Sequence, residues 1–226
     1  DYEIAEQLHE GRTSQVFRAT RRRDGTRVIL KALRREHSGP AAAARLEREA
    51  ELLRSCAGPA VAEVLALERW GTSPVLVLRD LGGESLRDLR ARRPDLPLLA
   101  RLDLALAICD ALAAVHAAGV VHRDLKPANI IVQADGRVQL IDFSAPAPGE
   151  GTLQYMSPEQ TGRTGRDVDH RSDYYALGVT LYELLTGRLP FAADDPLELV
   201  HAHLARVPPP PVSLSPDLGD TLSQLV

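Results

Sequence analysis

Eight consecutive residues decide how this chain is interpreted: His122-Arg123-Asp124-Leu125-Lys126-Pro127-Ala128-Asn129. They place an acid, a basic group and an amide at fixed offsets in one short loop. A second acid, Asp142, follows with Phe143 behind it, and the largely apolar run 138–141 in front of it is typical of a β-strand. Together, the two motifs supply two carboxylates, basic side chains and an amide.

Phosphoryl transfer from ATP requires groups of this kind. One carboxylate receives the proton of the attacking hydroxyl group, an amide and another carboxylate hold Mg²⁺, and a cation neutralises developing charge. The eight residues and the Asp-Phe pair resemble the catalytic core of the eukaryotic-type serine/threonine protein kinases, and the resemblance runs along nearly the whole chain. The plain alternative is a polar loop behind a core helix, and the eight matched positions argue against it.

The resemblance implies an α+β, bilobal fold with an ATP site between the lobes. Residues 1–81 would form a small β-rich N-lobe with one helix, and residues 82–226 a mostly α-helical C-lobe. We expect the C-lobe to be incomplete at its end, because the arginine partner of Glu159, an expected buried anchor, would lie beyond Val226. Glu159 must then be solvated or paired otherwise, since a buried unpaired charge is costly.

Within the resemblance, Asp124 accepts or orients the proton of the substrate hydroxyl group, and Lys126 neutralises charge on the transferring phosphoryl group. Asn129 and Asp142 are the expected oxygen ligands of Mg²⁺. Lys126 also accompanies serine/threonine specificity in the resembled family. Asp173 resembles the helix residue that holds the backbone of the catalytic loop.

Residues 151–159 (GTLQYMSPE) resemble the end of a kinase activation segment, in which Thr152 hydrogen-bonds near the catalytic loop. Two features depart from the family. Ser144 stands where a glycine is usual after Asp-Phe, and we expect it to limit flipping of the segment because glycine permits backbone angles that serine resists. Residues 145–150 contain no Ser, Thr or Tyr, so Arg123 has no obvious phosphate to meet there.

Val28-Ile29-Leu30-Lys31 resembles the strand whose lysine binds the α- and β-phosphates of ATP and pairs with a glutamate of the following helix. Glu49 fits that glutamate by position. Glu47 and Glu51 compete for the role, and periodicity does not exclude them.

The phosphate-covering loop is the weakest match, because one glycine remains of the usual three. The corresponding positions are His9, Gly11 and Ser14, followed by Val16. Gly11 still lets backbone amides approach phosphate, and Ser14 offers a hydroxyl group. The remaining residues that the resemblance assigns to the adenine pocket are Ile29, Leu78, Arg79, Leu81 and Ile131, with Val16 and Ile131 on opposite sides of the base.

Composition agrees with a globular protein of the cytoplasm, where cysteines are kept reduced. The 226 residues are 44% hydrophobic and 26% charged, and the net charge of −4 gives no electrostatic case for nucleic acid or an anionic membrane. Cys56 and Cys109 have no metal or redox spacing. The most apolar stretch, 98–121, is interrupted by Arg101 and two acids, which favours a buried core helix over a membrane span.

Periodicity predicts strands first and helices later, with a joint at Gly82-Gly83 between them. Gly187 is expected to end one of the helices. Strands are expected over 15–20, 27–33, 61–67 and 74–78; helices are expected over 40–54, 98–118, 173–186 and 197–205; an extended proline stretch is expected over 208–211.

Two short strings, 156–163 (MSPEQTGR) and 80–86 (DLGGESL), look like the N-terminal kinase domains of large multidomain bacterial sensors. The expected partners are therefore a protein substrate with Ser or Thr and further domains C-terminal to this one. Two other functions stay open. The altered glycine loop and Ser144 favour an ATP-binding regulatory module with little turnover. A small-molecule phosphotransferase would keep the catalytic loop but generally lacks the segment 152–159.

Overall fold

The computed structural model describes residues 1–143 and 153–224. The chain divides into two compact units, Asp1–Gly83 and Glu84–Val226. The division falls directly after Gly82 and Gly83, whose φ angles of 77° and 96° are disfavoured for any residue with a Cβ atom.

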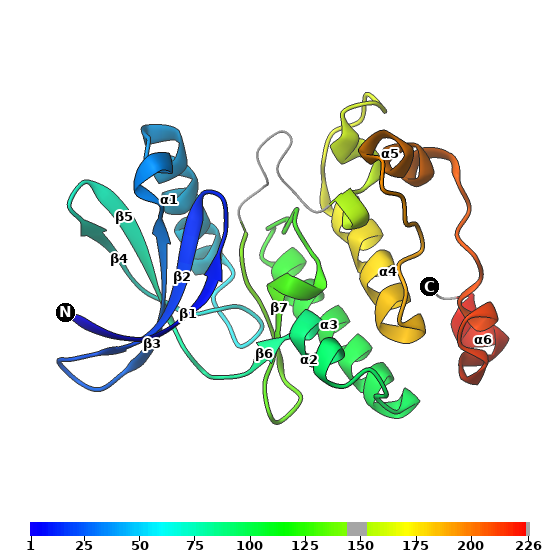
Figure 1. The fold of residues 1–226 in the computed structure, drawn as a ribbon, viewed down its shortest axis with the longest axis horizontal. Helices are drawn as coiled ribbons and strands as arrows, with labels where there is room; N and C mark the ends of the chain where they lie inside the picture. Colours follow the sequence, from blue (N-terminus) through cyan, green and yellow to red (C-terminus); the bar gives the residue numbers. More distant parts are fainter. Residues whose placement is uncertain (144–152, 225–226) are drawn as a thin grey trace. The chain divides into compact units, whose positions relative to one another are not determined.

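The first unit is an antiparallel five-stranded sheet with one long helix beside it (Figure 1). Its strand order is β1-β2-β3-β5-β4, so β1 and β4 are the edges. The helix α1 packs against β4 and β5. The elements are β1 (Tyr2–Glu10), β2 (Ser14–Arg21), β3 (Arg27–Leu33), η1 (Arg35–His37), α1 (Pro40–Ser55), β4 (Val64–Trp70) and β5 (Ser73–Arg79).

Alternation along β3 divides the sheet into two faces. Val28, Leu30 and Ala32 are buried on one face. There they pack with the apolar residues Ala19 of β2 and Val75 and Val77 of β5. Because side chains alternate along a strand, Ile29 and Lys31 lie on the opposite face.

Two strands of this unit differ from the sequence-based prediction. Strand β1 was not predicted, because nearly all of its side chains are exposed and it lacks the apolar alternation of a half-buried strand. Strand β4 covers 64–70 and not 61–67. Val61 and Ala62 are buried before the strand begins, and the hairpin continues to the pairing of Trp70 with Ser73 across the turn at Gly71.

The second unit is mostly helical, with a small three-stranded sheet of order β6-β7-β8 (Figure 1). The long helix α3 packs against α4 and β8. Its elements are β6 (Glu84–Ser85), α2 (Leu86–Arg92), α3 (Leu98–Ala117), η2 (Pro127–Asn129), β7 (Ile130–Val132), β8 (Val138–Leu140), η3 (Leu153–Tyr155), η4 (Pro158–Thr161), α4 (His170–Thr186), α5 (Pro196–Ala205), η5 (Pro211–Ser213), η6 (Pro216–Leu218) and α6 (Gly219–Ser223).

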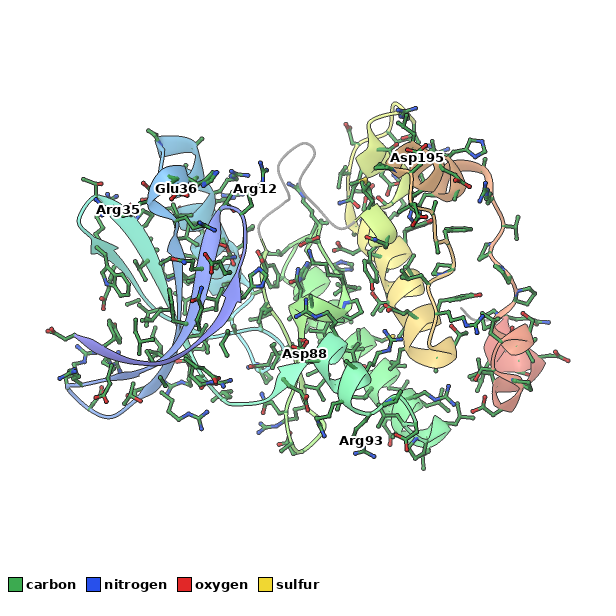
Figure 2. The ribbon with its side chains drawn as sticks, viewed as in Figure 1. Arg12, Arg35, Glu36, Asp88, Arg93 and Asp195 are labelled. Atoms are coloured by element: carbon green, nitrogen blue, oxygen red, sulfur yellow. The ribbon has the colours of Figure 1, made fainter. Side chains whose placement is uncertain are left out.

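Side-chain caps fix where several of these helices begin. Ser85 caps α2 by accepting the N–H of Asp88, and Asp195 caps α5 by accepting the N–H of Leu197. Figure 2 labels Asp88 and Asp195. Asp169 caps α4 in the same way, so this helix begins at His170, three residues before its predicted start. No helix in the described part of the chain combines the length and apolar composition that crossing a membrane requires.

Helix α4 offers a paired test of backbone conformation. A Cβ atom would meet no heavy atom within 4 Å at either Gly178 or Gly187, but only Gly187, the C-cap, has a positive φ, of 78°. We expect Gly178→Ala to stabilise the fold by about 0.5–1 kcal/mol and Gly187→Ala to destabilise it by about 1 kcal/mol. Urea unfolding followed by circular dichroism measures both. Changes of the same sign would contradict this account of the cap.

Candidate active site

The loop 122–129 is pinned to α4 by a single buried carboxylate. Asp173 is 1% exposed, and its Oδ2 and Oδ1 accept the backbone N–H groups of His122 and Arg123 at 2.8 and 2.7 Å. The Nε2 atom of His116 lies 2.8 Å from Oδ2. The prediction that Asp173 holds the loop backbone is confirmed. Arg123 has a φ of 69°, a conformation that a non-glycine residue adopts only when its surroundings hold it.

His122 joins this loop to the segment that carries Asp142. It is fully buried; its Nδ1 accepts the N–H of Asp124 at 3.3 Å, and its Nε2 lies 3.1 Å from the carbonyl oxygen of Ile141. These partners require Nε2 to carry the proton. Burial lowers the pKa of His122 despite the neighbouring carboxylates, so the neutral ring is favoured. The ring of Phe143 packs on it, with 4.5 Å between centroids.

Asp124, Lys126 and Asn129 form one hydrogen-bonded group. The Nζ atom of Lys126 lies 2.6 Å from Asp124 Oδ2, and the Nδ2 atom of Asn129 lies 2.9 Å from the same oxygen. Asn129 Nδ2 also donates to the carbonyl oxygen of Asp124 at 2.8 Å. Burial raises the pKa of Asp124, the Lys126 ammonium group opposes this rise, and the nearby Asp142 carboxylate adds to it.

Asn129 and Asp142 flank the paired strands β7 and β8. Ile130 pairs with Leu140, and the N–H of Ile141 donates to the carbonyl oxygen of Asn129 at 3.0 Å. Asp142 has a φ of 63°, which turns the chain directly after β8. The register therefore brings the two predicted Mg²⁺ ligands to the same end of this small sheet.

The donor set suits a magnesium ion that completes its shell with water and phosphate. The amide nitrogen of Asn129 is used for Asp124, so its oxygen is the end left for a cation, and Asp142 supplies a carboxylate. No cluster of three or more His, Cys, Asp or Glu side chains able to hold a metal occurs in residues 1–143 and 153–224. Mg²⁺ commonly binds through one or two protein oxygens plus substrate phosphates.

In the first unit, Lys31 is paired with Glu49. The Nζ atom lies 2.8 Å from each carboxylate oxygen, and the two side chains are 11% and 2% exposed. The competitors are engaged elsewhere, because Glu47 pairs with Arg69 and Glu51 with Arg48. The structure therefore selects Glu49 as the partner of Lys31 among the three glutamates that periodicity left open.

Four predicted nucleotide-binding residues share one face of the first sheet. Val16 pairs with Lys31, and Ile29 pairs with Leu78. Because Ile29 and Lys31 are two residues apart on β3, all four side chains lie on the face opposite the apolar core. Arg79, the last residue of β5, instead forms an ion pair with Glu63.

The remaining predicted contacts lie at the ends of strands. Gly11 follows β1 and Ser14 opens β2, and the N–H of Gly11 donates to the carbonyl oxygen of Ser14 at 2.9 Å. A Cβ atom at Gly11 would come within 3.1 Å of His9 Nε2, so a side chain there would require the exposed His9 ring to move. Leu81 is 49% exposed, and Ile131 is half-buried in β7 of the second unit.

A charge network around Asp80 was not predicted. Its side chain is 4% exposed, and Oδ2 accepts from Arg18 of β2 at 2.9 Å and Arg27 of β3 at 3.0 Å. Its Oδ1 accepts the N–H of Gly82 at 2.8 Å. The predicted adenine-binding stretch 79–81 is thereby fixed to the sheet. No sequence motif marks this network, because its members are far apart in the chain.

The segment 153–161 is tied to α4 at two places. Glu159 is half-buried and accepts a hydrogen bond from the hydroxyl group of Ser172 at 2.5 Å. Burial raises the pKa of Glu159, but the hydrogen bond from Ser172 and other hydrogen bonds lower it, so that the pKa lies below its ordinary value. Within the described residues, the Ser172 hydroxyl group is thus a hydrogen-bond partner of Glu159. Tyr155 donates to Glu183, whose other oxygen pairs with Arg90 at 2.6 Å.

Gln160 was also missed, although Ser157 three residues before it is a capping-box signature. Its Nε2 donates to the carbonyl oxygen of Arg123 at 2.7 Å. Thr152 and Ser144, two positions singled out in the sequence, lie outside the described residues.

The family model for the protein kinase domain matches residues 2–223. The chain belongs to the protein kinase domain family. Protein kinases generally use ATP and Mg²⁺ and act on proteins. The five-stranded sheet lies in the first unit and most helices lie in the second, which agrees with the expected α+β fold.

Curated relatives that match the chain are named as serine/threonine-protein kinases. The chain is 35% identical over 243 residues to a probable serine/threonine-protein kinase of Streptomyces coelicolor, and the match covers 100% of this chain and 36% of the relative. It is 34% identical over 242 residues to the serine/threonine-protein kinase PknA of Mycobacterium tuberculosis, covering 100% of this chain and 55% of the relative. The chain thus spans between about a third and about half of the length of these relatives.

Replacing Asp173 tests the pinning of the loop. An amide has one acceptor oxygen, so Asp173→Asn leaves one of the two backbone N–H groups without an acceptor. We expect a loss of about 2–3 kcal/mol, because hydrogen bonds to a buried charge are strong and a buried unsatisfied donor is costly. Chemical unfolding measures the loss, with the exposed Asp167→Asn as control. A change under about 0.5 kcal/mol would refute the pinning.

Proposed function

We propose that this chain transfers the γ-phosphate of ATP to serine and threonine hydroxyl groups of proteins, with Mg²⁺. The single observation that carries the proposal is the hydrogen-bonded group of Asp124, Lys126 and Asn129. Within it, one carboxylate oxygen faces both an ammonium group and an amide at 2.6 and 2.9 Å. The names of the curated relatives support the serine/threonine preference.

Asp124 is proposed to be the catalytic residue that accepts or orients the substrate hydroxyl proton. Its carboxylate is half-buried and held by two donors, so it is preorganised, and its raised pKa makes it a better base than an exposed aspartate. Lys126 would neutralise charge on the transferring phosphoryl group. Thr152 is proposed to hydrogen-bond near these two residues.

Asn129 and Asp142 are proposed to hold Mg²⁺, which when bound would neutralise phosphate charge. In the first unit, Lys31 would bind the α- and β-phosphates while Glu49 fixes its ammonium group, as their 2.8 Å ion pair supports. Nucleotide contacts are proposed for eight further residues of the two units. These are Gly11, Ser14, Val16, Ile29, Leu78, Arg79, Leu81 and Ile131.

We further propose that the chain acts in the cytoplasm as one domain of a larger protein. The relatives are roughly two to three times as long as the part matched here, which supports additional domains. The N-lobe and C-lobe of the proposed kinase would be residues 1–81 and 82–226, close to the two compact units.

Transfer of label from radioactive ATP tests the proposal. With Mg²⁺ and generic protein substrates, we expect label on serine and threonine, reduced about 10²–10⁴-fold in Asp124→Asn because the proton acceptor is lost. The exposed Asp110→Asn should keep wild-type activity. Nucleotide binding without transfer would point to a regulatory module, and label on small molecules only would point to a different phosphotransferase; either result contradicts the proposal.

The pH dependence of turnover tests the role of Asp124. A base with a raised pKa is active above that pKa and loses activity as the pH falls through it. We therefore expect the acid limb of kcat to lie above the ordinary aspartate value of about 3.9. Lys126→Met should move the limb to higher pH, since the cation lowers the pKa, and Lys126→Arg should move it less. An unmoved limb in Lys126→Met would exclude Asp124 as its source.

A further inference from the structure

Arg123, directly before Asp124, has a backbone conformation that its surroundings must hold. Its φ of 69° lies in the left-handed region, which is disfavoured for residues with a Cβ atom. Its N–H donates to Asp173 Oδ1 at 2.7 Å, which fixes one side of the residue. The other side is its carbonyl group, which belongs to the peptide bond that leads into Asp124.

That carbonyl oxygen accepts a hydrogen bond from Gln160 Nε2 at 2.7 Å. The N–H at the other end of the same peptide group, that of Asp124, donates to His122 Nδ1 at 3.3 Å. A peptide group is planar, so fixing its oxygen also fixes its N–H and the direction in which Asp124 begins. The contact made by Gln160 therefore reaches the proposed catalytic residue through one rigid group.

The direction of the Gln160 amide is set by Ser157. The backbone N–H and the hydroxyl group of Ser157 both donate to Gln160 Oε1, at 3.0 and 3.1 Å. Ser157 is fully buried, so these donors need an acceptor there. Oε1 must therefore face Ser157, and the NH₂ end is the one that faces Arg123. An acceptor at one end and a donor at the other is a requirement that glutamine meets and glutamate does not.

Gln160 belongs to η4, a short helix that is hydrogen-bonded to α4. Glu159, its neighbour in η4, accepts the hydroxyl group of Ser172 at 2.5 Å, and Ser172 precedes Asp173 in α4. Both bonds that hold Arg123 thus lead back to adjacent residues of one helix. An amide mounted on this frame can act as a fixed support.

We propose that Gln160 is a positioning residue for Asp124. Gln160 holds the peptide group between Arg123, whose φ is positive, and Asp124 by the carbonyl oxygen of that group. This inference rests on the proposed kinase function for its kinetic consequence, but its structural part does not. Gln160 itself touches no reacting atom in this scheme. Its loss should therefore lower kcat and leave the KM for ATP unchanged.

The discriminating variant is Gln160→Glu. The introduced carboxylate still accepts from Ser157 but has no proton for the Arg123 carbonyl oxygen. We expect kcat at pH 8 to fall about 10-fold, which corresponds to about 1.4 kcal/mol at the transition state. Gln160→Leu, which offers no donor at any pH, should fall at least as far. The exposed Gln224→Glu is the matched control and should behave as wild type.

The pH dependence separates positioning from a general loss of structure. An oxygen facing the carboxyl group of the Gln160→Glu variant raises its pKa, and once protonated the group can donate to Arg123 again. The ratio of wild-type to variant kcat should thus shrink as the pH falls from 8 to about 5.5, while the ratio for Gln160→Leu stays constant. The titratable groups Asp124, His122, Asp173, His116 and Glu159 lie around this peptide in every variant, and the ratio for Gln160→Leu shows whether their titration contributes.

Hydrogen exchange gives a readout that needs no activity. We expect faster amide exchange in the peptide that spans 122–126 in Gln160→Glu at pH 8, with protection restored toward pH 5.5 relative to wild type at the same pH. If wild type transfers no phosphate, the proposed function fails while this measurement still decides the inference. The inference would be overturned if Gln160→Glu showed the amide exchange and the kcat of wild type. A defect that did not change with pH in either variant would also overturn the inference.

Discussion

The second unit depends on one interaction, in which the carboxylate of Asp173 accepts two consecutive backbone N–H groups of the loop 122–129. A backbone N–H that is buried without an acceptor is costly, and here two of them are satisfied by one charged group that is itself 1% exposed. The bond to Arg123 also compensates for the left-handed conformation of that residue. Without this carboxylate, two backbone N–H groups of the loop would lose their acceptor, and Arg123 would lose one of the two hydrogen bonds that hold its left-handed conformation.

Further hydrogen bonds hold the remainder of the loop 122–129. His122 bridges to Ile141, so the chain that carries Asp142 is held beside the loop, and the ring of Phe143 closes the contact. Asn129 ties the far end of the loop back to Asp124 through its amide nitrogen. The result is a set of polar groups whose relative positions are held by hydrogen bonds within the second unit.

Much of this was predictable from the sequence, because local patterns determine it. The alternation over 27–33, the proline and apolar stripe of 40–54 and the glycine after Thr186 each describe an element that the structure contains with nearly those bounds. The loop 122–129 was recognisable because its residues are consecutive. Strand β1 was not predictable, since an exposed edge strand carries no apolar period.

The partners of the site residues were harder to predict, because they lie far away in the sequence. Glu49 was indistinguishable from Glu47 and Glu51 until the register of α1 against β3 was known. Asp80 needed Arg18 and Arg27 on two strands, which no spacing rule relates to it. Gln160 carried a local signature in its distance from Ser157, but its second partner, the carbonyl group of Arg123, is 37 residues away.

Two neighbouring residues of α4, Ser172 and Asp173, hold two separate segments of the second unit. Consecutive side chains on a helix point about 100° apart, so one helical turn holds both η4 and the loop 122–129 from two directions. A rotation of α4 about its axis would therefore displace both at once and in a fixed proportion. Lengthening the exposed stretch 162–167, which precedes the Asp169 cap of α4, would leave both anchors where they are. Added residues are therefore expected to be tolerated in this stretch.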